Sequence, residues 1–251
     1  MTMRILAVIG VGVSCLLLAA DEPEEKVRMS STERMDFPPG GTLRLRNSTG
    51  ALTVEGWEQP YVEITTIKST KVAYDARERG SAMHELDRVR VTAGRRGDEL
   101  VVTTDYPRHR IVFLPPLPYS LAEKVSFDLE YRIKAPRTAR LVAEHDAGEV
   151  NVDGLSGDID VTLRQGEVLL HLSEEGQYDI HAESDIGNVK SDFPGQEKPR
   201  RGLFGHRVVN GNSIAAHKLN LKVGFGDIVI LKTRTPTPPE PLGPAAKQEG
   251  L

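Results

Sequence analysis

An all-β fold is predicted by three features of this 251-residue sequence: a glycine-led phrase that repeats, alternation of apolar and polar residues, and many turn formers. The phrase is clearest in GEVNVDGLSGDIDVTLRQGEVLL, residues 148–170, where each glycine precedes a short alternating segment. A period of two places every second side chain on one face of a strand. The 23 glycines and 16 prolines supply the turns between such strands.

The glycine phrase predicts a stack of equivalent units. Its glycines are spaced by nine, nine, ten and eleven residues, and a sixth copy occupies 225–231; they are Gly148, Gly157, Gly166, Gly176 and Gly187. Each glycine is expected to allow a tight turn with positive φ before a strand of about five residues. We favour a single-stranded β-solenoid or β-helix-like stack with two repeats per coil. An antiparallel β-sandwich is the alternative.

The residue before each glycine favours the solenoid over successive hairpins. Two-residue hairpins prefer Asn, Asp or Gly there. The residues present are instead Ala147, Ser156, Gln165, Glu175 and Ile186.

The N-terminal segment 1–20 is typical of a secretory signal peptide. Arg4 precedes an uncharged run from Ile5 to Ala20, and an acidic segment follows. Cleavage after Ala20 is expected, which predicts an exported protein, periplasmic, secreted or at the cell surface. Two alternatives stay open: the segment is retained as a membrane anchor, or Cys15 is lipidated.

The body of the fold is expected at 37–232, after a flexible polar leader at 21–36. Strands are predicted near 42–46, 51–57, 61–66 and 125–134, and one short helix at 81–88. The predicted core is an aliphatic ladder with aromatic members: Val125, Phe127, Leu129, Tyr131, Ile133, Val150, Val152, Ile159, Val161, Val168, Leu170, Tyr178, Ile180, Ile228 and Ile230.

Two segments interrupt or end this pattern. Residues 191–213 separate the fifth and sixth copies and are expected to project as a loop or longer turn. The tail at 233–251 is proline-rich and is expected to be disordered, because it has few residues that bury apolar surface.

Composition removes several function classes. A formal net charge of −4 gives no basic field for a nucleic acid partner. Cys15 is the only cysteine, so a cleaved chain has no disulfide, no thiol nucleophile and no cysteine-based zinc site. No cofactor is predicted.

The segment YRIKAPRTARLVAEHDAGEVNVDGLSGDIDVTLRQGEVLL, with its strand ending in proline and its serial GDIDV-type units, resembles the DUF4097 β-strand-repeat family of exported bacterial proteins. The front part, GTLRLRNSTGALTVEGWEQPYVEITTIKST, is also similar to that family. The resemblance covers about Gly41–Lys232. It implies an adhesin-like β-solenoid of the cell envelope, and it implies no reaction for named residues.

Three sets of polar residues are candidates for chemistry, and none is predicted to be catalytic, cofactor-binding or metal-binding. His171, His181 and Asp179 would form a surface metal site only if neighbouring strands brought them together. The polar residues that follow the repeat glycines could form a row at one corner of a solenoid, and the acidic ones could bind calcium through their oxygens. They are Glu149, Asp158, Glu167, Gln177, Asn188 and Asp227.

The third set contains outward carboxylates that would serve a polysaccharide-active β-helix enzyme as general acid and base. Its members are Asp128, Glu130, Asp158 and Asp160. Charged residues that alternate along an exposed strand are also the ordinary pattern of an amphipathic strand.

The best interaction candidate is the segment KPRRGLFGHR, residues 198–207, which combines basic side chains with an apolar pair. Its candidate contacts are Lys198, Arg200, Arg201, Leu203, Phe204 and Arg207. The predicted function is a non-catalytic envelope scaffold or adhesin-like module that binds a protein, a glycan or a membrane surface. A polysaccharide-active enzyme and an envelope stress-signalling component are the alternatives.

Overall fold

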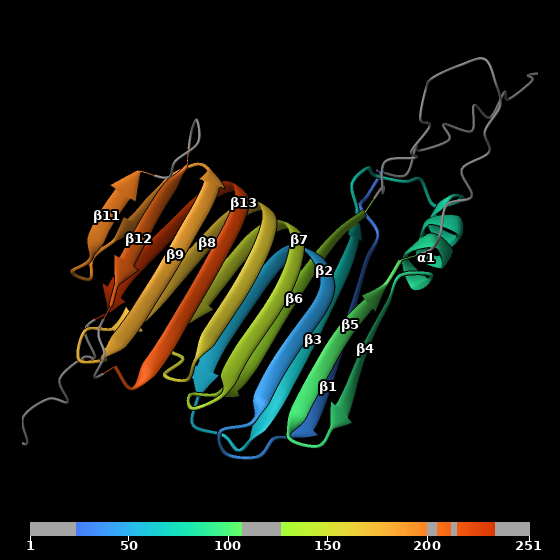
Figure 1. The fold of residues 1–251 in the computed structure, drawn as a ribbon. Coiled ribbons are helices and arrows are strands. Elements are labelled where there is room, and N and C mark those ends of the chain that lie inside the picture. Colours follow the sequence, from blue (N-terminus) through green and yellow to red (C-terminus); the bar gives the residue numbers. More distant parts are fainter. Residues whose placement is uncertain (1–23, 107–126, 200–204, 212–214, 234–251) are drawn as a thin grey trace, which may run out of the picture.

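The computed structural model describes residues 24–106, 127–199, 205–211 and 215–233. It has one helix, α1 (Arg79–Asp87), among these residues. The strands are β1 (Arg28–Asp36), β2 (Thr42–Trp57), β3 (Tyr61–Thr70), β4 (Arg90–Arg96), β5 (Glu99–Asp105), β6 (Phe127–Pro136), β7 (Arg140–Asp153), β8 (Ile159–Ser173), β9 (Tyr178–Ile186), β10 (Val189–Ser191), β11 (Gln196–Pro199), β12 (His206–Asn210) and β13 (His217–Thr233). The all-β class is confirmed, as Figure 1 shows.

Long strands lie in parallel at the centre of one mixed sheet, in the order β2, β7, β8, β13. Between β7 and β8, Leu141 lies beside Ile159 and Val150 beside Val168, eighteen residues apart in both cases. Only five residues join these two parallel strands. The end of β7 must therefore lie close to the start of β8, although the two strands are parallel. This is possible only if each long strand is bent back on itself.

The bend divides each long strand into a first and a second arm, and we call one pass through both arms a rung. In the first arm, β5 precedes β2 and β9 follows β13. In the second arm, β6 precedes β2 and β10 follows β13. Antiparallel strands complete both ends: β4 pairs with β5, β3 with β6 and β1 with β3, and β12 and β11 follow β9.

A column of glycines forms the bend. Gly50, Gly148, Gly166 and Gly226 pair in register across β2, β7, β8 and β13, and all have positive φ. A Cβ on Gly166 would lie 1.8 Å from the carbonyl oxygen of Gly148. The repeated glycine is therefore required because each rung stacks backbone against backbone at this corner.

The predicted turn role holds for only part of the repeat. Gly148, Gly166 and Gly187 have positive φ, whereas Gly157 and Gly176 do not. A Cβ on Gly157 would meet the carbonyl oxygen of Ala139 at 2.2 Å, so this glycine is needed for close approach at the link between rungs. The nine-residue spacing thus alternates between two kinds of corner.

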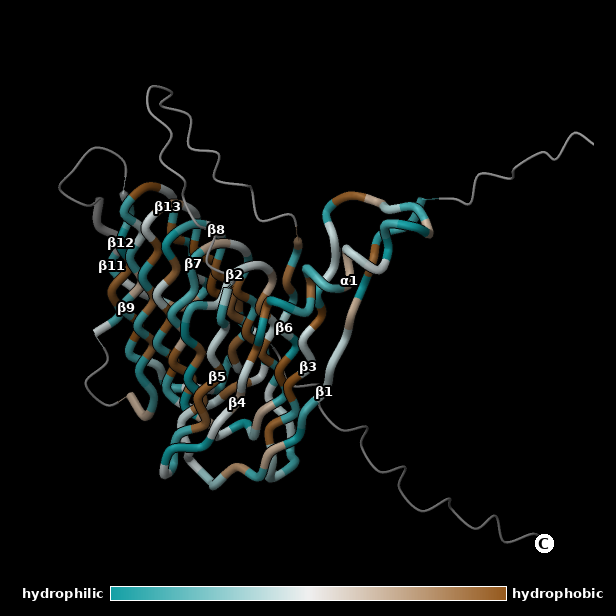
Figure 2. Tube along the Cα trace, turned by 90° about the vertical axis from the view of Figure 1, so that its right-hand side faces the viewer, coloured by the Kyte–Doolittle hydropathy of each residue, from teal (hydrophilic) through white to brown (hydrophobic). Residues whose placement is uncertain are grey.

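The core lies between the two arms. One cluster of buried residues takes side chains from both arms of the same strand, such as Leu141 and Val150 of β7. Phe193, beside Tyr178 with a ring-centroid distance of 5.4 Å, covers one end of this core. The predicted inward residues are buried except for Phe127, which is half-buried, and Val125, which lies outside the described residues. Figure 2 shows the brown and teal alternation along the strands.

The structure decides the strand order, which the sequence leaves open. The sixth copy, β13, lies between β8 and β9, so the order of strands in the sheet is not their order in the sequence. The central pairs are parallel, unlike those of the antiparallel sandwich alternative. All rungs offer the same glycine and the same inward aliphatic residues, so the local pattern does not encode which rungs are neighbours.

The leader prediction is wrong for part of its range. Residues 28–36 form β1, which pairs with β3 along its whole length. Its side chains are polar because β1 is an edge strand, and backbone hydrogen bonds hold it without an apolar pattern. The signal segment 1–20 lies outside the described residues.

The helix prediction is close: α1 covers residues 79–87, with Ala82 and Leu86 buried against Val27. The segment 191–213 is not simply a loop, because it contains the β11–β12 hairpin. No helix in the described part of the chain is long and apolar enough to cross a membrane. Of the predicted tail at 233–251, Thr233 is the last residue of β13, and 234–251 lie outside the described residues.

Candidate functional site

The second arms of β8 and β13 have apolar residues at some outward positions as well as on the inward face, while Glu167, His171 and Ser173 are the polar outward residues of β8. Their inward residues, including Leu170 and Ile230, are fully buried. Their outward residues Leu169 and Val229 pair side by side and are half-buried. Strands with apolar residues on both faces are typical of sheets that are covered on both sides. The outward side of this region therefore has the composition of a contact surface.

We define the β8–β13 face as Leu169, Val229 and Leu231 with the carboxylate row next to them. The carboxylates belong to Glu149, Glu167 and Asp227, which pair in register on β7, β8 and β13 and are exposed.

Parallel pairing sets adjacent residues of the carboxylate row about 4.8 Å apart along the stack. Glu149 and Glu167 have no ion pair with any described residue. Glu149 and Glu167 therefore present carboxylates that no described cation pairs with, while exposed Lys190 of β10 pairs in register with Val229 beside the row.

An exposed apolar pair lies on the other side of the carboxylate row, at the bend. Phe225 is 56% exposed and Ile186 is 46% exposed, and the two residues pair directly across β13 and β9. Along β13 the outward order is thus Phe225, Asp227, Val229 and Leu231. Large apolar side chains that stay exposed next to a further apolar patch commonly mark a binding surface.

The structure brings together three members of the predicted acidic ladder, because Glu149, Glu167 and Asp227 lie in one row. The fourth acidic member, Asp158, lies at the start of the first arm instead. Asp227 Oδ1 accepts a hydrogen bond from the backbone N of Asn188 at 2.7 Å. This bond joins β13 to the residue that precedes β10. Within the described ranges, no group of three or more metal-ligating side chains is suited to hold an ion.

The predicted histidine pair is not brought together. His171 pairs with Leu231 in the second arm, and His181 pairs with Asn220 in the first arm. Asp179 lies near His181 in β9 and pairs with Lys218. The ten-residue spacing between the histidines places them on opposite sides of a bend. The sequence pattern alone predicts that both histidines lie on one continuous face.

The carboxylates considered for acid–base catalysis are mostly held in structural contacts. Asp158 Oδ1 accepts a hydrogen bond from the backbone N of Lys218 at 2.9 Å. Asp128 pairs with Lys71 at 3.8 Å, and the carboxylate of Glu130 pairs with Arg28 at 3.7 Å. Asp160 lies in the first arm, two residues beyond Asp158, whereas the other two lie on β6. The four do not converge on one site.

The predicted interaction segment is only partly described. Lys198 of β11 pairs in register with Arg207 of β12, which in turn pairs with Glu183 of β9. Arg207 is half-buried, and its Nε is buried without a hydrogen-bond partner among the described residues. Arg200, Arg201, Leu203 and Phe204 lie outside the described residues, as does Cys15. The contact role of this segment stays a prediction.

A buried polar group at the bend was not predicted from the sequence. His145 is 3% exposed, and its Nδ1 lies 2.7 Å from Ser48 Oγ while its Nε2 lies 3.0 Å from the carbonyl oxygen of Gly50. Because that carbonyl can only accept, Nε2 donates and Nδ1 accepts from Ser48. Burial lowers the pKa of His145, so the neutral ring is the stable form there.

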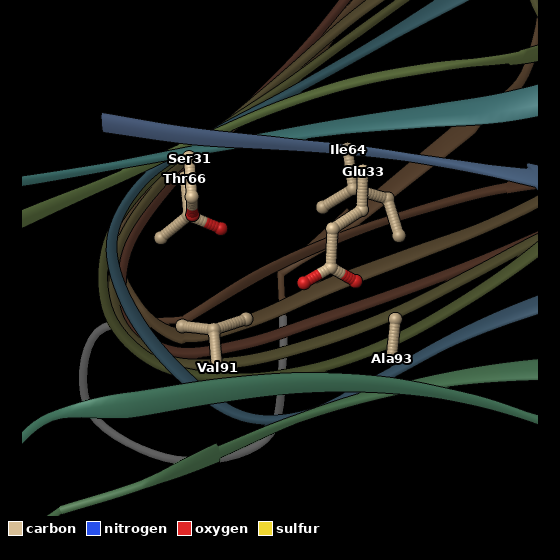
Figure 3. A pocket seen from close by; sticks show the side chains of 6 residues that line it. All are labelled: Ser31, Glu33, Ile64, Thr66, Val91 and Ala93. Atoms are coloured by element: carbon tan, nitrogen blue, oxygen red, sulfur yellow. The ribbon is translucent and has the colours of Figure 1, made fainter.

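A small pocket opens between the arms at the β1 end of the stack. Figure 3 shows its lining, with the carboxylate of Glu33 directed into the space: Ser31, Glu33, Ile64, Thr66, Val91 and Ala93. Its cavity volume of about 10 Å³ has room for about one water molecule and not for an organic ligand. A charge that points inward from an edge strand disfavours edge-to-edge pairing, which is a structural role for Glu33.

No protein-family model and no curated protein matches the chain. Among solved structures, a "putative cell adhesion protein" of Clostridium sporogenes is 15% identical with a TM-score of 0.44, covering 82% of this chain and all of that one. A "putative adhesin" of Parabacteroides merdae is 10% identical with a TM-score of 0.20, covering 82% and 79%. These scores are too low to say what this chain does, and the resemblance to the DUF4097 family stays a prediction.

Proposed function

We propose that this protein is a non-catalytic binding scaffold of the cell envelope, adhesin-like in kind, whose β8–β13 face contacts another macromolecule. One observation carries the proposal: the second arms of β8 and β13 have the outward apolar residues Leu169, Val229 and Leu231, and among the described residues the apolar core lies on the inner face only. Export through residues 1–20 is part of the proposal and rests on the sequence.

The stack suits this role because it is rigid and regular. Continuous parallel pairing joins β2, β7, β8 and β13, and the glycine column holds their corners in register. Outward side chains are thereby held in fixed rows while the inner face stabilises the fold. A preorganised surface of this kind avoids much of the ordering cost of binding.

Site-specific photo-crosslinking in the host cell tests the proposal. A photoreactive residue at position 229 is expected to form a covalent adduct with another macromolecule. The matched control is position 101, because Val101 is also an outward, half-buried valine but lies in the first arm on β5. Equal labelling from both positions, or none from 229, would refute the assignment of the face.

Cell fractionation with intact-mass measurement tests the envelope part. A mature chain that begins near Asp21 in an exported fraction is the expected result. A full-length chain confined to the cytoplasm would contradict export, and lipid on Cys15 would replace free export by anchoring. The rival enzyme hypothesis predicts glycan cleavage that is lost in Asp158→Asn and Asp160→Asn, and the scaffold proposal predicts none.

A further inference from the structure

We infer that the partner of the β8–β13 face is a cationic, apolar polypeptide segment. This inference rests on the proposed function and adds the chemistry of the partner. It is carried by the juxtaposition of an outward apolar patch with an in-register row of carboxylates, and each feature constrains a different property of the partner.

The apolar patch requires a partner that contributes apolar side chains. Leu169 and Val229 lie side by side on neighbouring strands, and Leu231 follows two residues beyond Val229 on the same face. Burying these side chains removes apolar surface from water, which is favourable in proportion to the area covered. A strongly hydrated polyanionic glycan offers little to such a patch.

The carboxylate row requires positive charge on the partner. Glu167 lies between Glu149 and Asp227 on adjacent strands, whose backbones are about 4.8 Å apart, so the neighbouring carboxylates repel one another. Lysine or arginine side chains laid along the row would relieve that repulsion and fix the orientation of the segment. The same row repels an anionic lipid surface, so the geometry favours a polypeptide over a membrane.

The bend extends the surface on the far side of the row. Phe225 and Ile186 are exposed there and pair with each other. Apolar groups thus border Asp227 on both sides, whereas Glu167 has Leu169 on one side and Gln165 on the other. The apolar groups beside Asp227 would shield a charge pair there from solvent when a segment is bound. Partial exclusion of water strengthens such pairs.

The test uses the full chain and two labelled probes, a short peptide of alternating lysine and leucine and its glutamate–leucine counterpart. The lysine peptide is expected to bind and the glutamate peptide is not. Glu149→Gln combined with Glu167→Gln is expected to weaken binding about tenfold at low salt and to flatten its salt dependence. Leu169→Thr combined with Val229→Thr is expected to weaken binding about tenfold at both low and high salt.

Matched controls lie in the first arm. Glu144→Gln with Asp160→Asn changes the net charge equally, and Val101→Thr changes an outward valine; neither is expected to alter binding. Thermal unfolding of every variant checks that the fold is retained, and threonine suits a strand position.

The outcomes separate this inference from the proposed function. If the threonine pair weakens binding but the glutamine pair does not, the face binds and the cationic character is overturned. If neither pair has an effect, the face itself is overturned. Binding to phosphatidylglycerol vesicles that Leu169→Thr with Val229→Thr abolishes would make the partner a membrane, and concentration-dependent dimers lost in the same variant would make it a second copy. Either result overturns the inference.

Discussion

The neighbouring rungs β7 and β8 have nearly the same inner face and different outer faces. Gly148 and Gly166 stack at the bend, and aliphatic residues follow both glycines on the buried side. On the outer side β7 presents Asn151 where β8 presents Leu169. Stacking therefore constrains the glycine and the inward residues of every rung, while the outward positions are free to differ and so to carry function.

The strongest way to break the stack is at the bend. Gly166→Ala is expected to lower the free energy of unfolding by about 5 kcal/mol, because φ is +139° and the new Cβ would lie 1.8 Å from a carbonyl oxygen. Denaturant unfolding measures the effect. Gly94→Ala is the control, since an added Cβ there has no neighbour within 4 Å. A wild-type midpoint for Gly166→Ala would refute the stacked bend.

A buried charge is the next largest disturbance. Val161→Asp is expected to lower the free energy of unfolding by about 4 kcal/mol, because Val161 is fully buried and a carboxylate there has no partner. The control is Thr162→Asp, which adds the same charge to the exposed neighbouring position. Thermal melting of the two variants should differ widely, and equal melting would show that Val161 is not part of the core.

Truncating one side chain on each face of β8 sharpens the comparison directly. Leu170→Ala is expected to cost about 3 kcal/mol, since Leu170 is fully buried and its loss leaves a cavity. Leu169→Ala is expected to cost less than about 1 kcal/mol, because Leu169 is already partly in water. Denaturant unfolding of the pair checks this, and equal losses would mean that both faces are buried in the isolated chain.

The smallest effect is a pH dependence at His145. Its folded-state pKa lies below the unfolded value, so the unfolded chain binds more protons and stability falls as the pH drops below about 6.5. The loss proceeds at up to about 1.36 kcal/mol per pH unit until the folded-state pKa is reached. Asp146, the charged neighbour, acts in the opposite sense and raises the pKa.

Chemical unfolding between pH 7.5 and about 5 measures this dependence. His145→Gln keeps a donor for the carbonyl of Gly50 but does not titrate, so its stability curve should be flatter over the same range. Parallel curves for the two proteins would show that other groups cause the loss.

Short-range patterning was enough to predict the all-β class, α1 within two residues at each end, and the inward rows. Period-two alternation and glycine spacing report on the environment of each residue along its own strand. The apolar runs VLLHL at 168–172 and IVIL at 228–231 also carried the signal of the β8–β13 face. Core strands alone account for most of this pattern, because the inward residues of both runs are apolar, so the outward apolar residues do not stand out in the sequence.

Side-chain alternation and the lack of a Cβ in glycine are local properties, so the residues alone predict glycine-led strands stacked around an aliphatic core. Long-range pairing is what places β13 between β8 and β9, makes polar β1 a strand, and brings Ser48 to His145 across 97 residues of chain. Rungs that share one local pattern are interchangeable to local rules, so long-range hydrogen bonding and packing select their order. The outward row of carboxylates beside an apolar patch exists only because of that order.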